Sequence, residues 1–171
     1  MKRGPRDVDA LFEQNVGPLA KTLDIAVRAV AGGKGKLHSA GRKGRLGHIY
    51  ISFLLSSVLC KLPWLRIDLY GENGRLGTSG RFAEWDVPDI SEALYLDAAY
   101  AAAQQEDVLR DYEIERNWIE SADEYFKAFE RFMPRIIRES QASQEISCRW
   151  HFGHFYGSSV TVFEGIEDEI L

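Results

Sequence analysis

The strongest constraint on the fold is a long apolar stripe in the second half of the chain. Its residues recur every three or four positions, which places them on one face of a helix. They are Ile114, Trp118, Ala122, Tyr125, Phe129, Phe132 and Ile136. The spacing predicts a helix over about 108–140, with Pro134 expected to kink or restart it. A helix of this length must bury its apolar face, so the rest of the chain must supply a second layer.

Two further segments show helical patterns. Apolar residues recur at helical spacing from Asp7 to Val30, and Gly17-Pro18 is expected to divide that segment into two helices. Another helix is predicted over 93–105, opened by Asp89 as the N-terminal cap. These helices would form the layer that the long apolar stripe requires.

Five other segments are typical of strands, because they are rich in β-branched and aromatic residues that alternate with polar ones. They are His48–Cys60, Trp64–Tyr70, a short piece within Arg75–Phe82, Ile146–Phe152 and Ser158–Glu164. Strong turn sequences separate neighbouring strands, both among the first three segments and between the last two. We therefore expect two hairpins, one on each side of the long helices in the chain.

Together these elements predict an α+β fold, because strands and helices come in runs and do not alternate strictly. The simplest arrangement is an antiparallel sheet made from two hairpins, at about 48–82 and 145–164. The N-terminal helix and the long helices at about 89–140 would pack on one face of this sheet. A chain of 171 residues fits a single domain, which we expect to span 1–171.

Composition predicts a soluble cytoplasmic protein. Apolar residues make up 45% of the chain, enough for a core without metals or disulfides, and no cofactor is predicted. Cys60 and Cys148 are expected to be buried free thiols, as is common in the cytosol. The most apolar run, Ile49–Cys60, is too short to cross a bilayer, and the basic N-terminus lacks the apolar stretch of a secretory signal.

The net charge of −5 is unevenly distributed. Residues 1–83 carry 14 basic and 6 acidic side chains, whereas residues 84–171 carry 7 basic and 20 acidic ones. This asymmetry is typical of an anion-binding N-terminal half. It is also expected where two halves pack together and neutralise each other, and we prefer this second interpretation.

A basic, glycine-rich loop is predicted at 32–47. Its candidate anion-binding residues are Lys34, Lys36, Arg42, Lys43 and Arg45. The loop has no P-loop motif and no aromatic residue for base stacking, so nucleic acid is not the favoured partner. The preferred interpretation is a solvated connection, and the acidic C-terminus at 165–171 is also expected to fray.

A metal site is a second candidate, because Cys148, His151 and His154 are all competent ligands. Residues three apart on a strand point to opposite faces, so the spacing weakens this prediction. A further ligand, His38 or His48, would have to come from elsewhere in the chain. The preferred interpretation places Cys148 in the core, His151 on the solvent face and His154 in a turn.

Aromatic residues supply the last candidate. If helices cover only one face of the sheet, Tyr50, Trp64 and Tyr70 are predicted to line the open face as a partner surface. Either this half-covered sheet or the helix face at Ala98–Ala103 is expected to form a homodimer contact.

No hydrolase motif surrounds any cysteine or serine, so whether the protein is an enzyme stays open. The favoured hypothesis is a non-catalytic binding or regulatory module that acts through a protein partner or self-association. One alternative is a small enzyme or ligand-binding protein with a histidine and carboxylate site between sheet and helices. Its residues would include His48, His151 and His154. Another alternative is binding of phosphate or nucleic acid through the 32–47 loop. No membrane partner is expected.

Overall fold

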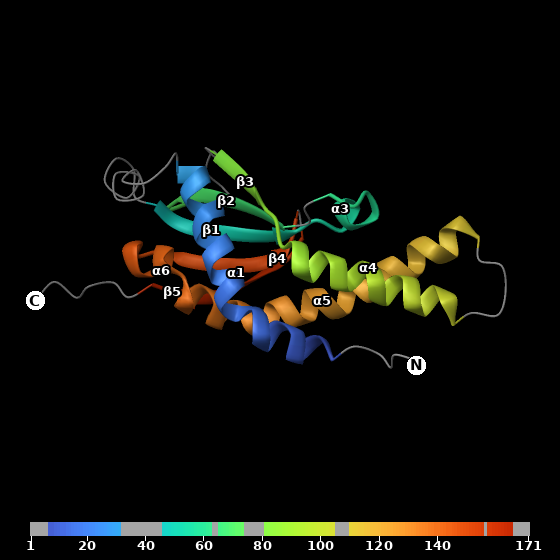
Figure 1. Ribbon diagram of the computed structural model, residues 1–171. Helices are drawn as coiled ribbons and strands as arrows, with labels where there is room; N and C mark the ends of the chain where they lie inside the picture. Colours follow the sequence, from blue (N-terminus) through green and yellow to red (C-terminus); the bar gives the residue numbers. More distant parts are fainter. Residues whose placement is uncertain are drawn as a thin grey trace, which may run out of the picture.

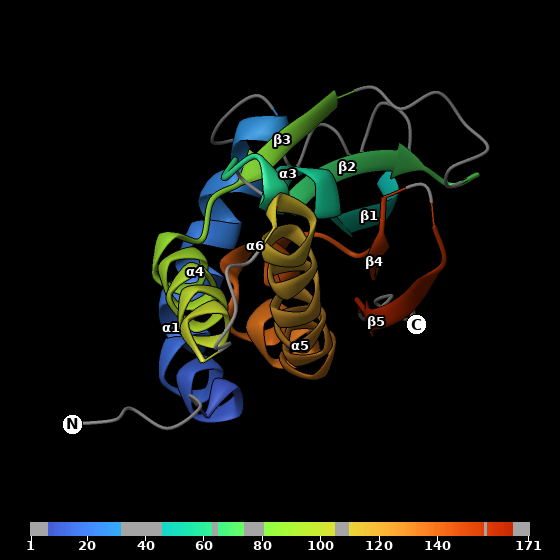
Figure 2. The same cartoon turned by 90° about the vertical axis from the view of Figure 1, so that its right-hand side faces the viewer.

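The computed structural model describes residues 7–31, 46–62, 65–73, 81–104, 110–155 and 157–165. Helices cover one side of a five-stranded sheet (Figures 1 and 2). The helices are α1 (Val8–Ala31), α3 (Leu55–Leu59), α4 (Pro88–Ala103), α5 (Asp111–Glu139) and α6 (Gln141–Glu145). The strands are β1 (Leu46–Phe53), β2 (Leu65–Gly71), β3 (Arg81–Trp85), β4 (Arg149–His154) and β5 (Ser159–Glu164).

The sheet has the order β3-β2-β1-β4-β5 and is mixed. The α+β class is therefore confirmed, but the predicted all-antiparallel sheet is wrong, because β1 and β4 run parallel. Their register pairs Tyr50 with His151 and Phe53 with His154. Between β3 and β4 the chain passes through α4 and through α5, which is 29 residues long. Such a crossover lets two strands that are distant in the sequence run in the same direction.

Several predicted element boundaries were also wrong. The strand expected at His48–Cys60 ends at Phe53, and α3 follows it. The strand expected within Arg75–Phe82 continues past its predicted end to Trp85, and residues 74–80 lie outside the described residues. Helix α4 has Val87 at its N-terminal cap and Pro88 in its first turn, so Asp89 is not the cap. Proline is well accommodated there, because the first helical N–H groups have no partner within the helix.

Neither internal proline divides its helix. Pro18 lies inside α1 and Pro134 inside α5, and both helices continue past them. Met133 and Ile136, on either side of Pro134, are fully buried. Tertiary packing of these flanking residues offsets the cost of a helix proline, which is about 3 kcal/mol.

The core lies between the helices and one face of the sheet. The predicted stripe on α5 is confirmed at Tyr125 and Phe129, which are both fully buried. Phe129 meets Phe12 of α1 edge to face, with ring centroids 4.7 Å apart, and also faces Phe152 of β4 at 6.2 Å. On the far edge of the sheet, the Trp85 indole N–H donates to Thr22 of α1 at 2.9 Å. Helix α1 thus packs against the β3 side of the sheet, and α5 packs against the β4 side.

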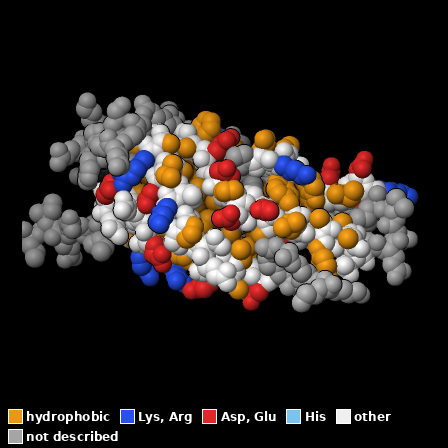
Figure 3. Space-filling view, in the orientation of Figure 1, with side chains coloured by type: hydrophobic (Ala, Val, Ile, Leu, Met, Phe, Trp, Pro, Cys, Tyr) orange, Lys and Arg blue, Asp and Glu red, His pale blue; other side chains and the backbone are white. Residues whose placement is uncertain are grey.

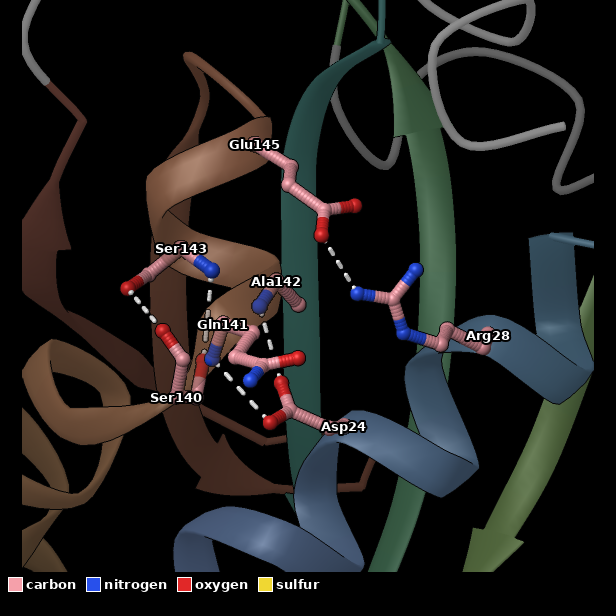
Figure 4. Close-up of polar contacts among 7 residues, drawn as sticks. All are labelled: Asp24, Arg28, Ser140, Gln141, Ala142, Ser143 and Glu145. Carbon is pink, nitrogen blue, oxygen red and sulfur yellow. Dashed lines mark hydrogen bonds and ion pairs between the residues drawn. The ribbon is translucent and has the colours of Figure 1, made fainter. Parts of the chain in front are cut away.

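A polar clasp joins α1 to α6 and fixes the chain just before β4 (Figure 4). The Asp24 carboxylate accepts hydrogen bonds from the backbone N–H groups of Gln141 and Ala142, at 3.0 and 2.8 Å. One turn further along α1, Arg28 pairs with Glu145 at 2.6 Å. The carboxylate satisfies N–H groups that have no partner within the short helix. The clasp therefore sets where β4 begins beside β1.

Within the described part of the chain, three ion pairs cross between its two halves, all through α1. They are Asp9–Arg131, Glu13–Arg135 and Arg28–Glu145. In the first two, the acid comes from the basic half and the base from the acidic half, so these pairs oppose the overall asymmetry.

Among the described residues, none of the helices is both long and apolar enough to span a membrane.

Candidate binding surface on the sheet

Alternation along the strands gives the sheet two different faces. On β1, Ile49, Ile51 and Phe53 face the helices and are at most 2% exposed. The intervening residues face the other side, which none of the described helices covers (Figure 2). We call this the helix-free face. Its central residues are His48, Tyr50, Ser52, Arg66, Asp68, Tyr70, His151 and Thr161.

Four rings meet on this face, and we call them the ring cluster: His48, Tyr50, Tyr70 and His151. The Tyr50 ring stacks on His151 with centroids 4.3 Å apart and planes 14° apart. It also meets Tyr70 edge to face at 5.3 Å. The His48 and His151 rings have centroids 5.1 Å apart. Because each ring contacts another, the cluster holds its members in fixed positions on three adjacent strands.

A chain of hydrogen bonds runs through both histidines. Thr161 Oγ1 lies 3.3 Å from His151 Nδ1, and His151 Nε2 lies 2.9 Å from His48 Nδ1. His48 Nε2 lies 3.2 Å from the backbone oxygen of Glu72. The chain thus crosses from β5 through β4 and β1 to the end of β2.

Gly47 allows the contact between the His48 ring and the backbone oxygen of Glu72. A Cβ atom at this position would lie 2.7 Å from Glu72 Cα and 3.0 Å from Glu72 N, closer than real side chains approach. Only glycine leaves room for the backbone at Glu72 to pack against β1. This close approach brings the Glu72 carbonyl within reach of the neighbouring His48 ring.

An ion pair lies on the same face, on β2. Arg66 holds the Asp68 carboxylate through Nε and Nη2, at distances of 2.7–3.1 Å. Its guanidinium also stacks over the rings of Phe82 and Phe155, at 3.9 and 4.7 Å from their centroids. Asp68 is only 2% exposed, so its charge is compensated by this pairing and not by water.

The three predicted metal ligands are not brought together. Cys148 lies in the core, as predicted, where burial raises the pKa of its thiol to about 12. Cys60 is exposed, so the prediction that both thiols are buried is wrong for Cys60. His154 stacks on Phe126 of α5 with centroids 4.1 Å apart, whereas His151 lies on the helix-free face. Within the described ranges, no group of three or more His, Cys, Asp or Glu side chains is placed to hold a metal.

Other predicted site residues lie outside the described residues. These are the anion-binding candidates Lys34, Lys36, Arg42, Lys43 and Arg45, and the aromatic Trp64. Of the predicted loop at 32–47, only Leu46 and Gly47 are described, and they begin β1. Of the C-terminal segment at 165–171, only Gly165 is described.

Tyr50 and Tyr70, both predicted for the partner surface, do lie together. The pairing of His48 with His151 was missed, because the site was expected between the sheet and the helices. The polar residues at every second position, His48 and Tyr50 on β1 and Arg66 and Asp68 on β2, carried this signal in the sequence. They mark the face that turns away from the core.

A second exposed cluster lies on the helical side, around α3 and α4. Lys61 lies over the Trp118 ring at 5.1 Å, and Tyr95 donates to the Val58 carbonyl at 2.9 Å. Leu62 and Leu96 are 57% and 48% exposed, and hydrophobic side chains gather over α4 in the space-filling view (Figure 3). Its described contacts tie α3 to α4 and α5, so they have a structural role.

Comparison with known proteins gives no relative. No protein-family model matches the chain, and no significant match is found among the curated proteins or the solved structures.

Proposed function

We propose that this protein is a non-catalytic binding module that docks a protein partner on its helix-free face. The observation that carries this proposal is the ring cluster, which lies on the face that the described helices leave uncovered. Tyr70, Tyr50 and His48 are each only partly buried. Aromatic side chains of this kind are enriched where proteins bind one another.

The cluster is also prepared for binding before a partner arrives. Tyr50 is held between His151 and Tyr70, and Arg66 is held by Asp68 and two further rings. Side chains that are already fixed lose little conformational entropy when a partner covers them. A pre-organised aromatic surface therefore supports docking better than an equal area of mobile side chains.

The charge of this face favours a protein partner over nucleic acid. Its described charges are two ion pairs, Arg66 with Asp68 at 2.7 Å and Arg149 with Glu164 at 3.4 Å, and the exposed acidic residues Glu72 and Glu84. Protein surfaces that bind nucleic acid carry an excess of positive charge for phosphate contacts, and the described charges of this face show no such excess. A partner would contact the rings and their polar atoms directly.

The test compares two variants in retention of partner proteins on the immobilised chain. Changing Tyr50→Ala and Tyr70→Ala together is expected to lower affinity about 30-fold or more, because anchoring aromatics contribute about 2 kcal/mol or more. The matched control, Leu96→Ala, removes an exposed apolar side chain from the helical side and should leave binding unchanged. A partner that is retained equally by both variants would exclude the helix-free face as the docking site.

One observation favours a second candidate, a small enzyme. The contact of the Thr161 hydroxyl with His151, which in turn contacts His48, matches the arrangement of a nucleophile, a base and an orienting group. A fluorophosphonate probe would label an activated hydroxyl at this position. Labelling that is lost in Thr161→Val would favour the enzyme, whereas no labelling at Thr161 would favour the binding module.

A further inference from the structure

The hydrogen-bond chain on the helix-free face has a defined direction. A backbone carbonyl only accepts, so His48 Nε2 must carry the hydrogen that is donated to Glu72. In a neutral His48 ring, Nδ1 then accepts, and the hydrogen between the rings belongs to His151 Nε2. His151 Nδ1 in turn accepts from the Thr161 hydroxyl. If both rings are neutral, the chain of hydrogen bonds therefore fixes one tautomer for each ring.

This chain accepts one proton without losing a hydrogen bond. If His151 Nδ1 becomes protonated, it donates to Thr161, whose hydroxyl changes from donor to acceptor by rotation. The hydrogen bond between His151 and His48 is unchanged. A second proton, on His48 Nδ1, would place two N–H groups against each other and break that bond. The pair therefore has room for a single added charge.

The arrangement of the two rings supports this interpretation. Their centroids are 5.1 Å apart, whereas the facing nitrogens are 2.9 Å apart. The difference is close to the sum of the two ring radii, so the rings meet nearly end to end along the line between the nitrogens. A straight N–H···N contact is the geometry of a strong hydrogen bond.

We propose that the His48–His151 pair takes up one proton, and that this charge makes the helix-free face a docking site for a carboxylate-bearing protein segment. This inference rests on the proposed function. It names the class of partner and the protonation step that regulates binding. Protonation also frees the Thr161 hydroxyl hydrogen, which then points away from His151 as a donor to the partner. Thr161 is exposed, so a carboxylate has access to it.

The groups around the histidine pair either favour or oppose a positive charge on it. On its own strand, His48 has Tyr50, whose stacked ring favours a positive charge on His151. Burial of His151, which is 9% exposed, opposes that charge.

The neighbouring strands contribute a tyrosine, two ion pairs and the carboxylate of Glu72. Strand β2 presents Tyr70 and the Arg66–Asp68 pair, followed by the exposed Glu72. Strands β4 and β5 present the Arg149–Glu164 pair. Docking that requires the proton is strongest below the pH at which the pair titrates, and it is lost as the pH rises through that step.

The first experiment follows the imidazole signals of the free protein by NMR from pH 8 to pH 5. We expect His48 and His151 to respond together to the uptake of one proton. His154, which stacks on Phe126 away from this chain, is the internal control, and His154→Gln assigns its signal. Two independent one-proton steps for His48 and His151 would overturn the proposal. Thr161→Val, which removes one end of the hydrogen-bond chain, tests the same chain without changing either ring.

The second experiment uses phenylacetate as the probe and phenylacetamide as its uncharged match. Phenylacetate is expected to shift the signals of Tyr50 and Thr161 below the titration step. Its affinity should fall about tenfold per pH unit above that step, because binding is linked to one proton. Equal binding of the amide, or equal binding at both pH values, would overturn the proposal.

The two proposals fail separately. A partner that requires Tyr50 and Tyr70 but binds equally at pH 5 and pH 8 would contradict this inference. The proposed function would still be supported. A partner that ignores both tyrosines would sink the proposed function, even if the histidine pair titrates as described.

Discussion

The two faces of the sheet are built from alternate residues of the same strands, yet they are stabilised in different ways. Toward the helices, Ile51 and Ile67 lie in a continuous apolar core. On the other face, Ser52, Asp68 and His151 are also buried, although all three are polar. The first face is held by apolar burial, and the second by ring contacts and paired polar groups.

This difference indicates a division of roles. Apolar burial gives most of the favourable free energy of folding. Polar groups that are fixed in place contribute less net stability, but they give a surface a specific pattern of donors and acceptors. We therefore expect changes on the covered face to affect folding, and changes on the helix-free face to affect binding.

The largest expected contrast concerns the two thiols. With the pKa of the Cys148 thiol raised to about 12 by burial, about one molecule in ten thousand carries the reactive thiolate at pH 8. The exposed Cys60 should react with a disulfide reagent, while Cys148 should not until the protein unfolds. Because this pKa is higher folded than unfolded, the thiol's contribution to stability is complete below about pH 9 and is lost as the pH rises toward 12. Rapid modification of Cys148 by the disulfide reagent in the folded Cys60→Ser variant would contradict the burial of this thiol in the core.

Next in size is the loss of a core ring. Phe129→Ala is expected to lower the free energy of unfolding by about 3–5 kcal/mol, because it leaves a cavity beside Phe12 and Phe152. The matched change on the other face, Tyr70→Ala, should cost only about 1 kcal/mol, since Tyr70 is already partly exposed. Urea unfolding of both variants measures the contrast. Equal losses would mean that the two faces do not differ as described.

The ion pair on the helix-free face should have an intermediate effect. Asp68→Ala leaves Arg66 without its carboxylate and is expected to cost about 2 kcal/mol. Replacing both residues, with Arg66→Met and Asp68→Leu, should restore most of that stability but weaken partner binding. A double variant that is as unstable as the single one would show that the pair itself stabilises the fold.

The clasp before β4 should have a smaller effect on folding. Asp24→Ala removes the acceptor for two backbone N–H groups of α6 and is expected to cost about 1 kcal/mol. It should also shift the NMR signal of His151, because the clasp sets where β4 begins. Asp123→Ala, which breaks only an exposed pair with Lys127, is the control and should change stability by no more than about 0.5 kcal/mol.

The smallest expected effect on stability is that of Thr161→Val. This change keeps the shape of an exposed side chain and should alter the free energy of unfolding by about 0.5 kcal/mol or less. It removes the hydroxyl end of the hydrogen-bond chain, so the histidine titration should change even though folding does not. A variant with an unaltered titration would show that Thr161 is not part of the chain.

Local patterns in the sequence predicted the elements, but not how distant elements meet. The apolar stripe of α5 and the alternation of β1 each depend on a single segment, so both could be recognised. The parallel pairing of β1 with β4 depends on a crossover through α4, α5 and α6, which alternation does not encode. For the same reason His48 and His151, which are 103 positions apart, could not be paired in advance.

The most direct test of the central claim is a comparison of photo-crosslinking from two positions. A benzophenone amino acid replaces Tyr70 on the helix-free face in one version of the protein, and Leu96 on the helical side in the other. We expect partner adducts from position 70 and none from position 96. Adducts from position 96 alone would contradict the account and transfer the docking site to the exposed cluster around α4.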